Sequence, residues 1–154
     1  MPVYLIRHAK AGDRAKWKGP DERRPLSAKG RGQAEALADQ LGVRQVGLVV
    51  SSPSLRCVQT VEPLAARLGL AVDTEESLAE GAAEEDALAL VRKLSSEHPA
   101  LCSHGDVIPL VLDALVRQDG LTLSDGYPCA KGSVWVLDQD DDGRFSSATY
   151  LPAP

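Results

Sequence analysis

The sequence has few cysteines and no long apolar run, and both shortages exclude classes of protein. Cysteine occurs three times in 154 residues, as Cys57, Cys102 and Cys129. An odd count without a Cys-x-x-Cys pair indicates neither a disulfide framework nor a zinc site. No apolar run approaches the roughly 18 residues of a membrane-spanning helix. The first residues lack the basic segment of a secretory signal, so we expect a cytoplasmic protein with free thiols and no membrane partner.

Positive charge is also in short supply, with 17 Lys and Arg against 22 Asp and Glu and a net charge of −5. This balance disfavours nonspecific binding to nucleic acid. An anionic substrate therefore needs a local basic pocket, for which Arg7, Arg56 and Lys10 are available. The apolar content of 44% is that of a globular protein, and the length suits one domain spanning residues 1–154.

The apolar pattern alternates between short buried strands and amphipathic helices. We expect strands at residues 3–8, 46–51, 70–74, 100–103, 133–138 and 145–151, and helices at residues 28–41, 52–68, 84–96 and 106–118. Asp142-Gly143 is a typical hairpin turn, so the last two strands should pair. The order predicts an α/β fold: a three-layer α/β/α sandwich with a mostly parallel sheet and a C-terminal hairpin.

The helix expected at residues 52–68 has two irregular features. Pro63 lies in its interior and should kink it or split it in two. The residues at helical spacing include one charge in an otherwise apolar stripe, which we expect to face the core: Leu55, Val58, Glu62, Ala65 and Leu68.

Three apolar segments end in residues that suit phosphoryl transfer. Arg7-His8 ends the first strand, Ser51–Thr60 supplies Arg56 after the second, and Ser103-His104 ends a later one. Ligands of parallel sheets bind beyond the carboxyl ends of the strands. A neutral imidazole can attack phosphorus and later leave it, and two guanidinium groups can hold the phosphoryl oxygens.

These segments, in this order, resemble the histidine phosphatase superfamily. Arg7-His8 is similar to its Arg-His-Gly motif, with Ala9 in place of glycine, and Ser51–Thr60 is similar to its Ser-Ser-x-x-x-Arg-x-x-Gln-Thr segment. Arg24–Gly30 resembles the Arg-Pro-Leu-(Thr/Ser)-x-x-Gly segment of the small SixA-like branch. The chain also resembles the phosphatase domain found with Nudix domains in actinobacterial nucleotide-pool enzymes. The resemblance implies a phosphoglycerate mutase-like fold and activity without a cofactor or metal.

The resemblance assigns a role to each catalytic candidate. His8 is the nucleophile, and the like charges of Arg7 and Arg56 should favour its neutral form. His104 donates to the phosphoryl group, and Gly105 permits a close backbone approach. Glu80 is the expected acid for the leaving group, with three nearby alternatives: Glu76, Glu84 and Glu85.

Three further residues are candidates for substrate binding. Lys10 would contact a second phosphate, and Lys131 would lean into the pocket. Each would otherwise be a solvated surface lysine. Trp17 would stack on a nucleobase, or would anchor its charged loop. Ala9 should narrow the pocket floor slightly while keeping its backbone N–H.

The leading hypothesis is a metal-independent phosphatase that acts through phosphohistidine on a small phosphate ester or nucleoside phosphate. One alternative is a SixA-like phosphatase acting on a phosphohistidine protein, and another is a noncatalytic phosphate-binding module. The chain lacks the long insertions of phosphoglycerate mutases, which favours hydrolysis over mutase activity. It also lacks a Nudix box, and the sequence leaves the oligomeric state open.

Overall fold

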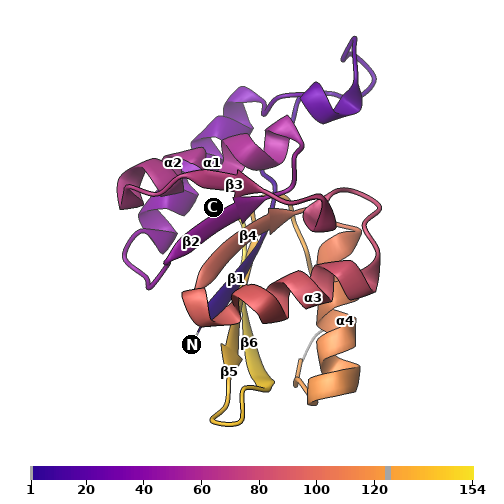
Figure 1. Cartoon of the computed structure of the whole chain (residues 1–154). Helices are drawn as coiled ribbons and strands as arrows, with labels where there is room; N and C mark the ends of the chain where they lie inside the picture. Colours follow the sequence, from indigo (N-terminus) through magenta and orange to yellow (C-terminus); the bar gives the residue numbers. More distant parts are fainter. Residues whose placement is uncertain (1, 124–125) are drawn as a thin grey trace.

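The computed structural model describes residues 2–123 and 126–154, which form three layers around one mixed sheet (Figure 1). The strands are β1 (Pro2–Arg7), β2 (Leu48–Ser51), β3 (Val72–Thr74), β4 (Pro99–Ser103), β5 (Val134–Gln139) and β6 (Phe145–Leu151). The helices are α1 (Ala28–Leu41), α2 (Leu55–Leu68), α3 (Glu84–Leu94) and α4 (Val107–Asp119), with 3₁₀ turns at Asp21–Arg23, Glu76–Leu78 and Ser95–Glu97. Ser124 and Asp125, which lie between the helix expected at 106–118 and the strand expected at 133–138, are outside the described residues.

The sheet has the order β3-β2-β4-β1-β5-β6. Strands β1 to β4 pair in parallel, whereas β5 runs antiparallel to both β1 and β6. The expected sandwich with a mostly parallel sheet and a C-terminal hairpin is therefore confirmed. None of the helices within the described ranges is long and apolar enough to cross a membrane.

Strand β1 shows why the sheet is covered on both faces. Val3 and Leu5 belong to the core formed with α3 and α4, whereas Tyr4 and Ile6 belong to the core formed with α1 and α2. Successive strand side chains point to opposite faces, so a continuous apolar run requires a helical layer on each side. The sequence therefore specifies a central strand.

The register of the parallel strands determines where the functional residues lie. Arg7 at the end of β1 pairs with Ser103 at the end of β4, and Ser51 on β2 pairs with Cys102. The three motif segments thus leave the sheet at the same edge. The backbone N–H of His8 also donates to the Ser103 carbonyl at 3.1 Å, which extends the pairing of β1 and β4 beyond the last strand residue.

The structure rules out one of the two effects expected of Pro63, that it splits helix α2 in two. The helix runs without interruption from Leu55 to Leu68, so Pro63 does not split it. Val61, Leu64 and Ala65 are buried on either side of the proline. Packing of this face against the sheet compensates for the one backbone hydrogen bond that proline cannot donate.

The expected core stripe of α2 was wrong by about one residue. Leu55 and Val58 are only half-buried, and Glu62 is exposed. The face that is buried includes two polar residues: Arg56, Cys57, Thr60, Val61, Leu64 and Ala65. An apolar periodicity selects the wrong face when the buried face contains functional polar side chains. Element ends also differ slightly: β2 begins at Leu48, β3 at Val72, and α3 ends at Leu94.

The start of α1 is fixed against the segment that follows β1. Ser27 is the N-cap, and its Oγ accepts from the Gly30 N–H at 3.1 Å. The backbone N–H of Ser27 donates to the Lys10 carbonyl at 2.9 Å. A Cβ added to Gly30 would lie 1.9 Å from that same carbonyl oxygen. Because Gly30 has no side chain, the start of α1 can pack directly against the backbone of Lys10, two residues after His8.

We expect Gly30→Ala to lower the free energy of unfolding by about 1–3 kcal/mol, because the added methyl group overpacks a backbone contact. Gly32→Ala is the matched control, since no atom lies within 4 Å of a Cβ at that position of the same helix. It should raise stability by about 0.5–1 kcal/mol, because alanine has the higher helix propensity. Urea denaturation measures both, and equal effects of the two substitutions would contradict this account of the packing.

Candidate active site

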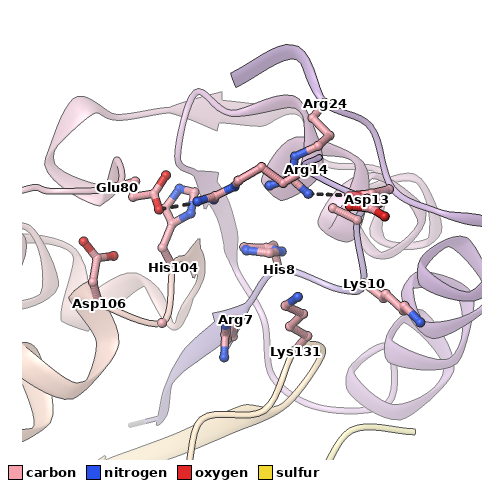
Figure 2. A pocket seen from close by; sticks show the side chains of 13 residues that line it. Arg7, His8, Lys10, Asp13, Arg14, Arg24, Glu80, His104, Asp106 and Lys131 are labelled. Carbon is pink, nitrogen blue, oxygen red and sulfur yellow. Dashed lines mark hydrogen bonds and ion pairs between the residues drawn. The ribbon is translucent and has the colours of Figure 1, made fainter. Parts of the chain in front are cut away.

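A cavity of about 580 Å³ opens at the carboxyl edge of the sheet, and the two motif histidines line it (Figure 2). Its walls come from the ends of β1 and β4, the loop after β1, the Glu80 segment and the loop before β5. The lining residues are Arg7, His8, Lys10, Ala11, Gly12, Asp13, Arg14, Arg24, Glu80, His104, Gly105, Asp106 and Lys131.

His8 is held in one tautomer by the backbone carbonyl of the next residue. Its Nδ1 lies 2.8 Å from the carbonyl oxygen of Ala9. A carbonyl oxygen can only accept, so Nδ1 carries the proton and Nε2 carries the lone pair. The imidazole is 6% exposed and lines the cavity. The free nitrogen is therefore a nucleophile.

The environment of His8 keeps the imidazole neutral. Burial, which disfavours the charged ring, is the main cause that lowers the pKa of His8 to about 3. The charges of His104, Arg56 and Arg7 lower it further, against the opposing effect of the Ala9 hydrogen bond. The expected effect of the two arginines is present, although desolvation is larger.

Arg7 lies beside His8 with its guanidinium folded against Gly105. Its Nη1 donates to the Cys129 carbonyl at 2.6 Å, whereas its buried Nε has no partner in the described residues. A Cβ on Gly105 would lie 2.7 Å from Cζ of Arg7. Gly105 thus permits a close approach, as expected, but the group that approaches is the Arg7 guanidinium.

Arg56 does not line the cavity as the sequence suggested. Its side chain is 1% exposed, and Nη2 lies 3.1 Å from Oε2 of Glu80 and 3.2 Å from Oδ2 of Asp21. Its Nη1 donates to the Asp21 carbonyl at 2.9 Å. The two carboxylates occupy the guanidinium that was expected to hold phosphoryl oxygens. A phosphoryl group must therefore compete with Glu80 for Arg56.

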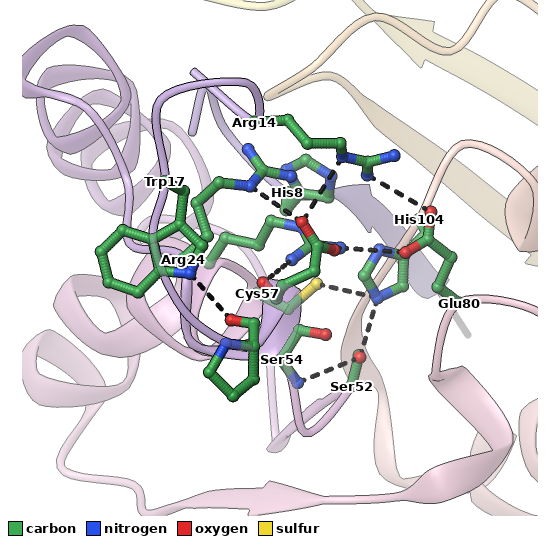
Figure 3. A network of polar contacts seen from close by, with 12 residues as sticks. His8, Arg14, Trp17, Arg24, Ser52, Ser54, Cys57, Glu80 and His104 are labelled. Atoms are coloured by element: carbon green, nitrogen blue, oxygen red, sulfur yellow. Dashed lines mark hydrogen bonds and ion pairs between the residues drawn. The ribbon is translucent and has the colours of Figure 1, made fainter. Parts of the chain in front are cut away.

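Asp21 joins three arginines of the site (Figure 3). It accepts from Arg24 at 3.0 Å and pairs with Arg14 at 3.4 Å, besides its contacts with Arg56. Partial burial raises the pKa of Asp21, but the Arg24 hydrogen bond and the arginine charges hold it below its usual range. Arg14 also pairs with Glu80 at 3.6 Å. The resulting network forms one wall of the cavity.

His104 faces His8 across the cavity floor. Their ring centroids are 5.4 Å apart with an interplanar angle of 64°. The Nε2 of His104 lies 2.8 Å from Oγ of Ser52 and 3.5 Å from Sγ of Cys57. The structure therefore brings both candidate histidines together, as the sequence predicted.

Five cations gather around the two histidines. Burial, followed by the charges of Arg7, Arg24, Lys10 and Arg14, lowers the pKa of Lys131. Figure 2 shows Lys131 pointing into the cavity between Arg7 and His8, whereas the Lys10 side chain extends away from His8. This crowding of like charges favours a bound anion.

The structure does not support the base-stacking role expected of Trp17 or the narrowing of the cavity floor expected of Ala9. Trp17 neither lines this cavity nor anchors its loop to the core: its side chain is exposed, and its Nε1 donates to the Pro20 carbonyl of the same loop at 2.8 Å. Ala9 is fully buried against Leu26, so its methyl group does not narrow the cavity floor. The Ala9 N–H donates to Oγ1 of Thr60 at 2.9 Å and is not directed at a ligand.

Several residues of the site were not singled out from the sequence. Ser52, Gln59 and Thr60 belong to the recognised segment and bind the other motifs: Ser52 to His104, Gln59 to the Leu26 N–H, and Thr60 to Ala9. Their place in the motif was a usable signal. Arg14 and Asp21 lie in a charged loop whose sequence has no pattern that identifies them. Within residues 2–123 and 126–154, no group of three or more His, Cys, Asp or Glu is placed to hold a metal ion.

The fold and the paired histidines agree with a family comparison. A family model described as the histidine phosphatase superfamily (branch 1) matches residues 3–87. The chain belongs to the histidine phosphatase superfamily, which confirms the resemblance read from the motifs.

Individual relatives differ in their named substrates. An 8-oxo-(d)GTP phosphatase of Mycolicibacterium smegmatis is 36% identical over 162 residues, which cover 99% of this chain and 48% of that protein. The chain thus spans about half the length of this curated relative. A structure from Agrobacterium tumefaciens, described as a SixA-type phosphohistidine phosphatase, has a TM-score of 0.76 at 29% identity and covers 98% of this chain and 97% of that one. A mycobacterial glucosyl-3-phosphoglycerate phosphatase shares the fold, with a TM-score of 0.73 at 21% identity, and covers 99% of both chains.

The burial of neutral His8 makes a pH dependence of stability testable. The folded ring stays neutral to about pH 3, whereas the unfolded ring takes up a proton near its ordinary pKa of 6.5. The unfolded state binds more protons between these values, so stability is lost as the pH falls from 6.5 towards 3. His8→Gln should remove this part of the loss, which is about 3 kcal/mol between pH 7 and pH 4 and about 5 kcal/mol over the full range. Urea denaturation at pH 7 and pH 4 measures it, and parallel losses in both proteins would contradict a buried neutral His8.

Proposed function

We propose that this protein is a metal-independent phosphatase that transfers the phosphoryl group of its substrate to Nε2 of His8 and then to water. The observation that carries the proposal is the state of His8. Its Nδ1 proton is bound by the Ala9 carbonyl, and its pKa of about 3 leaves the facing nitrogen unprotonated at physiological pH. A nucleophile of this kind in a cavity lined by cations suits an attack on a phosphate ester.

The first step forms a bond between Nε2 of His8 and phosphorus and breaks the bond from phosphorus to the leaving oxygen. Arg7 and His104 lie on the cavity side, where they would stabilise charge on the phosphoryl oxygens. Those oxygens also compete for Arg56. Once Arg56 binds them, Glu80 loses its partner at 3.1 Å.

Release from Arg56 lets the Glu80 carboxyl group act on protons. In its protonated form it would give a proton to the leaving oxygen as the first bond breaks. The resulting carboxylate would then take a proton from the water that attacks the phosphohistidine. Inorganic phosphate departs, and His8 returns to its neutral state. Glu80 lines the cavity and is half exposed, which suits exchange with solvent between the two steps.

The crowded cations favour substrates with more than one phosphate group. Lys10, Arg14, Arg24 and Lys131 extend the positive lining beyond the immediate surroundings of His8. The 36% identical relative named for 8-oxo-(d)GTP supports the same choice. We therefore place nucleoside phosphates first among the substrate classes.

A phosphohistidine protein is the second candidate substrate. The observation in its favour is the 29% identity, over nearly the whole chain, to the SixA-type structure. In that reaction the leaving group is an imidazole nitrogen, which needs less help from an acid than an alkoxide does.

Inorganic phosphate release in the presence of a chelator tests the chemistry. The panel contains nucleoside mono-, di- and triphosphates, an aryl phosphate and a phosphohistidine protein. We expect turnover with the natural protein and a loss of at least about 1,000-fold in His8→Ala, since the covalent route disappears. Reactions with ³²P-labelled substrate, quenched with alkaline detergent, should leave the natural protein labelled with a phosphate that is stable to alkali and released by acid.

The panel also separates the alternatives. The preferred member identifies the substrate class, and loss of activity in chelator would contradict metal independence. Absence of turnover on every member, with phosphate still bound, would leave a noncatalytic phosphate-binding module in place of the enzyme.

Glu80→Gln tests the proton donor. It should slow hydrolysis of alkyl phosphates by about 100-fold and of aryl phosphates much less, because general acids matter most for poor leaving groups. Glu76→Gln is the matched control, since Glu76 lies in the same segment but does not line the cavity. If Glu80→Gln slows both ester classes equally, Glu80 acts through Arg56 rather than on the leaving group.

A further inference from the structure

Ser52 is the buried residue of the site that the reaction above does not use. It follows β2 at the carboxyl edge of the sheet and is fully buried. It is absent from the residues that line the cavity. Its Oγ nevertheless lies 2.8 Å from Nε2 of His104, which does line the cavity. A polar side chain in this position acts on a catalytic group and not on the substrate.

The contacts of Ser52 determine which way this hydrogen bond runs. Its Oγ accepts from the backbone N–H of Ser54 at 3.3 Å. A hydroxyl group has one proton and two lone pairs, and this contact uses one lone pair. Within the described residues the Ser52 proton has no hydrogen-bond acceptor other than Nε2 of His104, so donation to His104 satisfies both groups. When Ser52 donates, Nε2 of His104 must accept. The neutral ring then carries its proton on Nδ1.

Cys57 is the competing partner of the same nitrogen. Its Sγ lies 3.5 Å from Nε2 of His104, and its thiol proton is directed at the Ser103 carbonyl at 3.7 Å. Burial raises the pKa of the Cys57 thiol, whereas the Cys102 thiol and His104 lower it below its ordinary range, and a thiolate would draw the proton onto Nε2. The Ser52 contact is shorter by 0.7 Å on these distances and has no other use for its proton.

We propose that Ser52 is a positioning residue that holds the proton of His104 on Nδ1, so that His104 offers an N–H to the phosphoryl group. The effect of Ser52 on catalysis rests on the proposed phosphatase function, whereas its effect on the tautomer does not. Figure 3 shows Ser52 and Cys57 meeting one nitrogen of the ring, with the other nitrogen pointing away from them. That other nitrogen makes no hydrogen bond to residues in the described part of the chain, and His104 lines the cavity.

Under this proposal, one of the two facing imidazoles offers a lone pair and the other offers an N–H. The Ala9 carbonyl accepts from Nδ1 of His8, which leaves a lone pair on Nε2 for attack. The Ser52 hydroxyl donates to Nε2 of His104, which leaves an N–H on Nδ1 for binding. One ring can attack phosphorus while the other stabilises the charge on its oxygens. The titratable groups that contact His104 are His8, which follows β1, and Cys57 from α2, and Glu80 lies beside the ring on the cavity side (Figure 2).

The ¹⁵N NMR spectrum of the imidazoles reads the tautomer directly, and the chain has only three histidines to assign. In the natural protein His104 should show a protonated Nδ1 and an unprotonated Nε2. Ser52→Ala should shift the ring towards the Nε2–H form. Ser54→Ala is the matched control, because it makes the same change two residues away and keeps the backbone N–H that Ser52 accepts.

Kinetics on the preferred substrate provide the second readout. Ser52→Ala should lower kcat about tenfold with little change in KM, as expected for one hydrogen bond made to the transition state. Ser54→Ala should keep both constants. Circular dichroism and thermal unfolding establish that the variants remain folded.

The spectrum of the natural protein alone can overturn the proposal. A proton on Nε2 of His104 would contradict it even if Ser52→Ala failed to fold. A tautomer that changes in Cys57→Ala but not in Ser52→Ala would assign the role to Cys57. Because the spectrum needs no substrate, a protein without phosphatase activity can still show the expected tautomer, so the two proposals fail separately.

Discussion

The parallel pairing of β1 with β4 is the constraint on which the site depends. The register that places Arg7 opposite Ser103 brings His8 and His104 out at one edge, with ring centroids 5.4 Å apart. A slip of one residue would send the side chains of one strand to the opposite face. The apolar runs on both faces prevent such a slip, because it would exchange the side chains that face the two helical layers. Hydrophobic packing therefore sets the geometry of the chemistry.

The motif residues matter to one another as much as to a ligand. Thr60 accepts from the Ala9 N–H after the Arg7-His8 pair, and Gln59 accepts from the Leu26 N–H of the Arg24–Gly30 segment. Ser52 contacts His104. A buried polar group that lacks a partner is costly, so these contacts must be complete for the site to exist. The motifs are therefore more informative as an ordered set than singly. Each supplies hydrogen-bond partners that the others require.

The sequence was a good guide where local pattern determines structure. It located the strands that end in Arg7 and Ser103, the helix that begins at Ala28 and the C-terminal hairpin. It was a poor guide where partners come from distant parts of the chain. The buried face of α2 was misread because Arg56 and Thr60 occupy it, and nothing in the loop pattern indicated that Asp21 would bind Arg56. Such pairings exist only after the strands have assembled.

The Asp21 network joins two parts of the molecule that are held together by different forces. The sandwich is held by apolar burial, whereas residues 14–24 are linked to the buried Arg56 of α2 through ion pairs in which Asp21 and Arg14 are partly exposed. Exposed ion pairs are screened by salt, and apolar burial is not. The rim of the cavity therefore responds to the ionic medium independently of the scaffold. Cellular ionic strength and the concentration of competing anions thus become variables that set how firmly the entrance is closed.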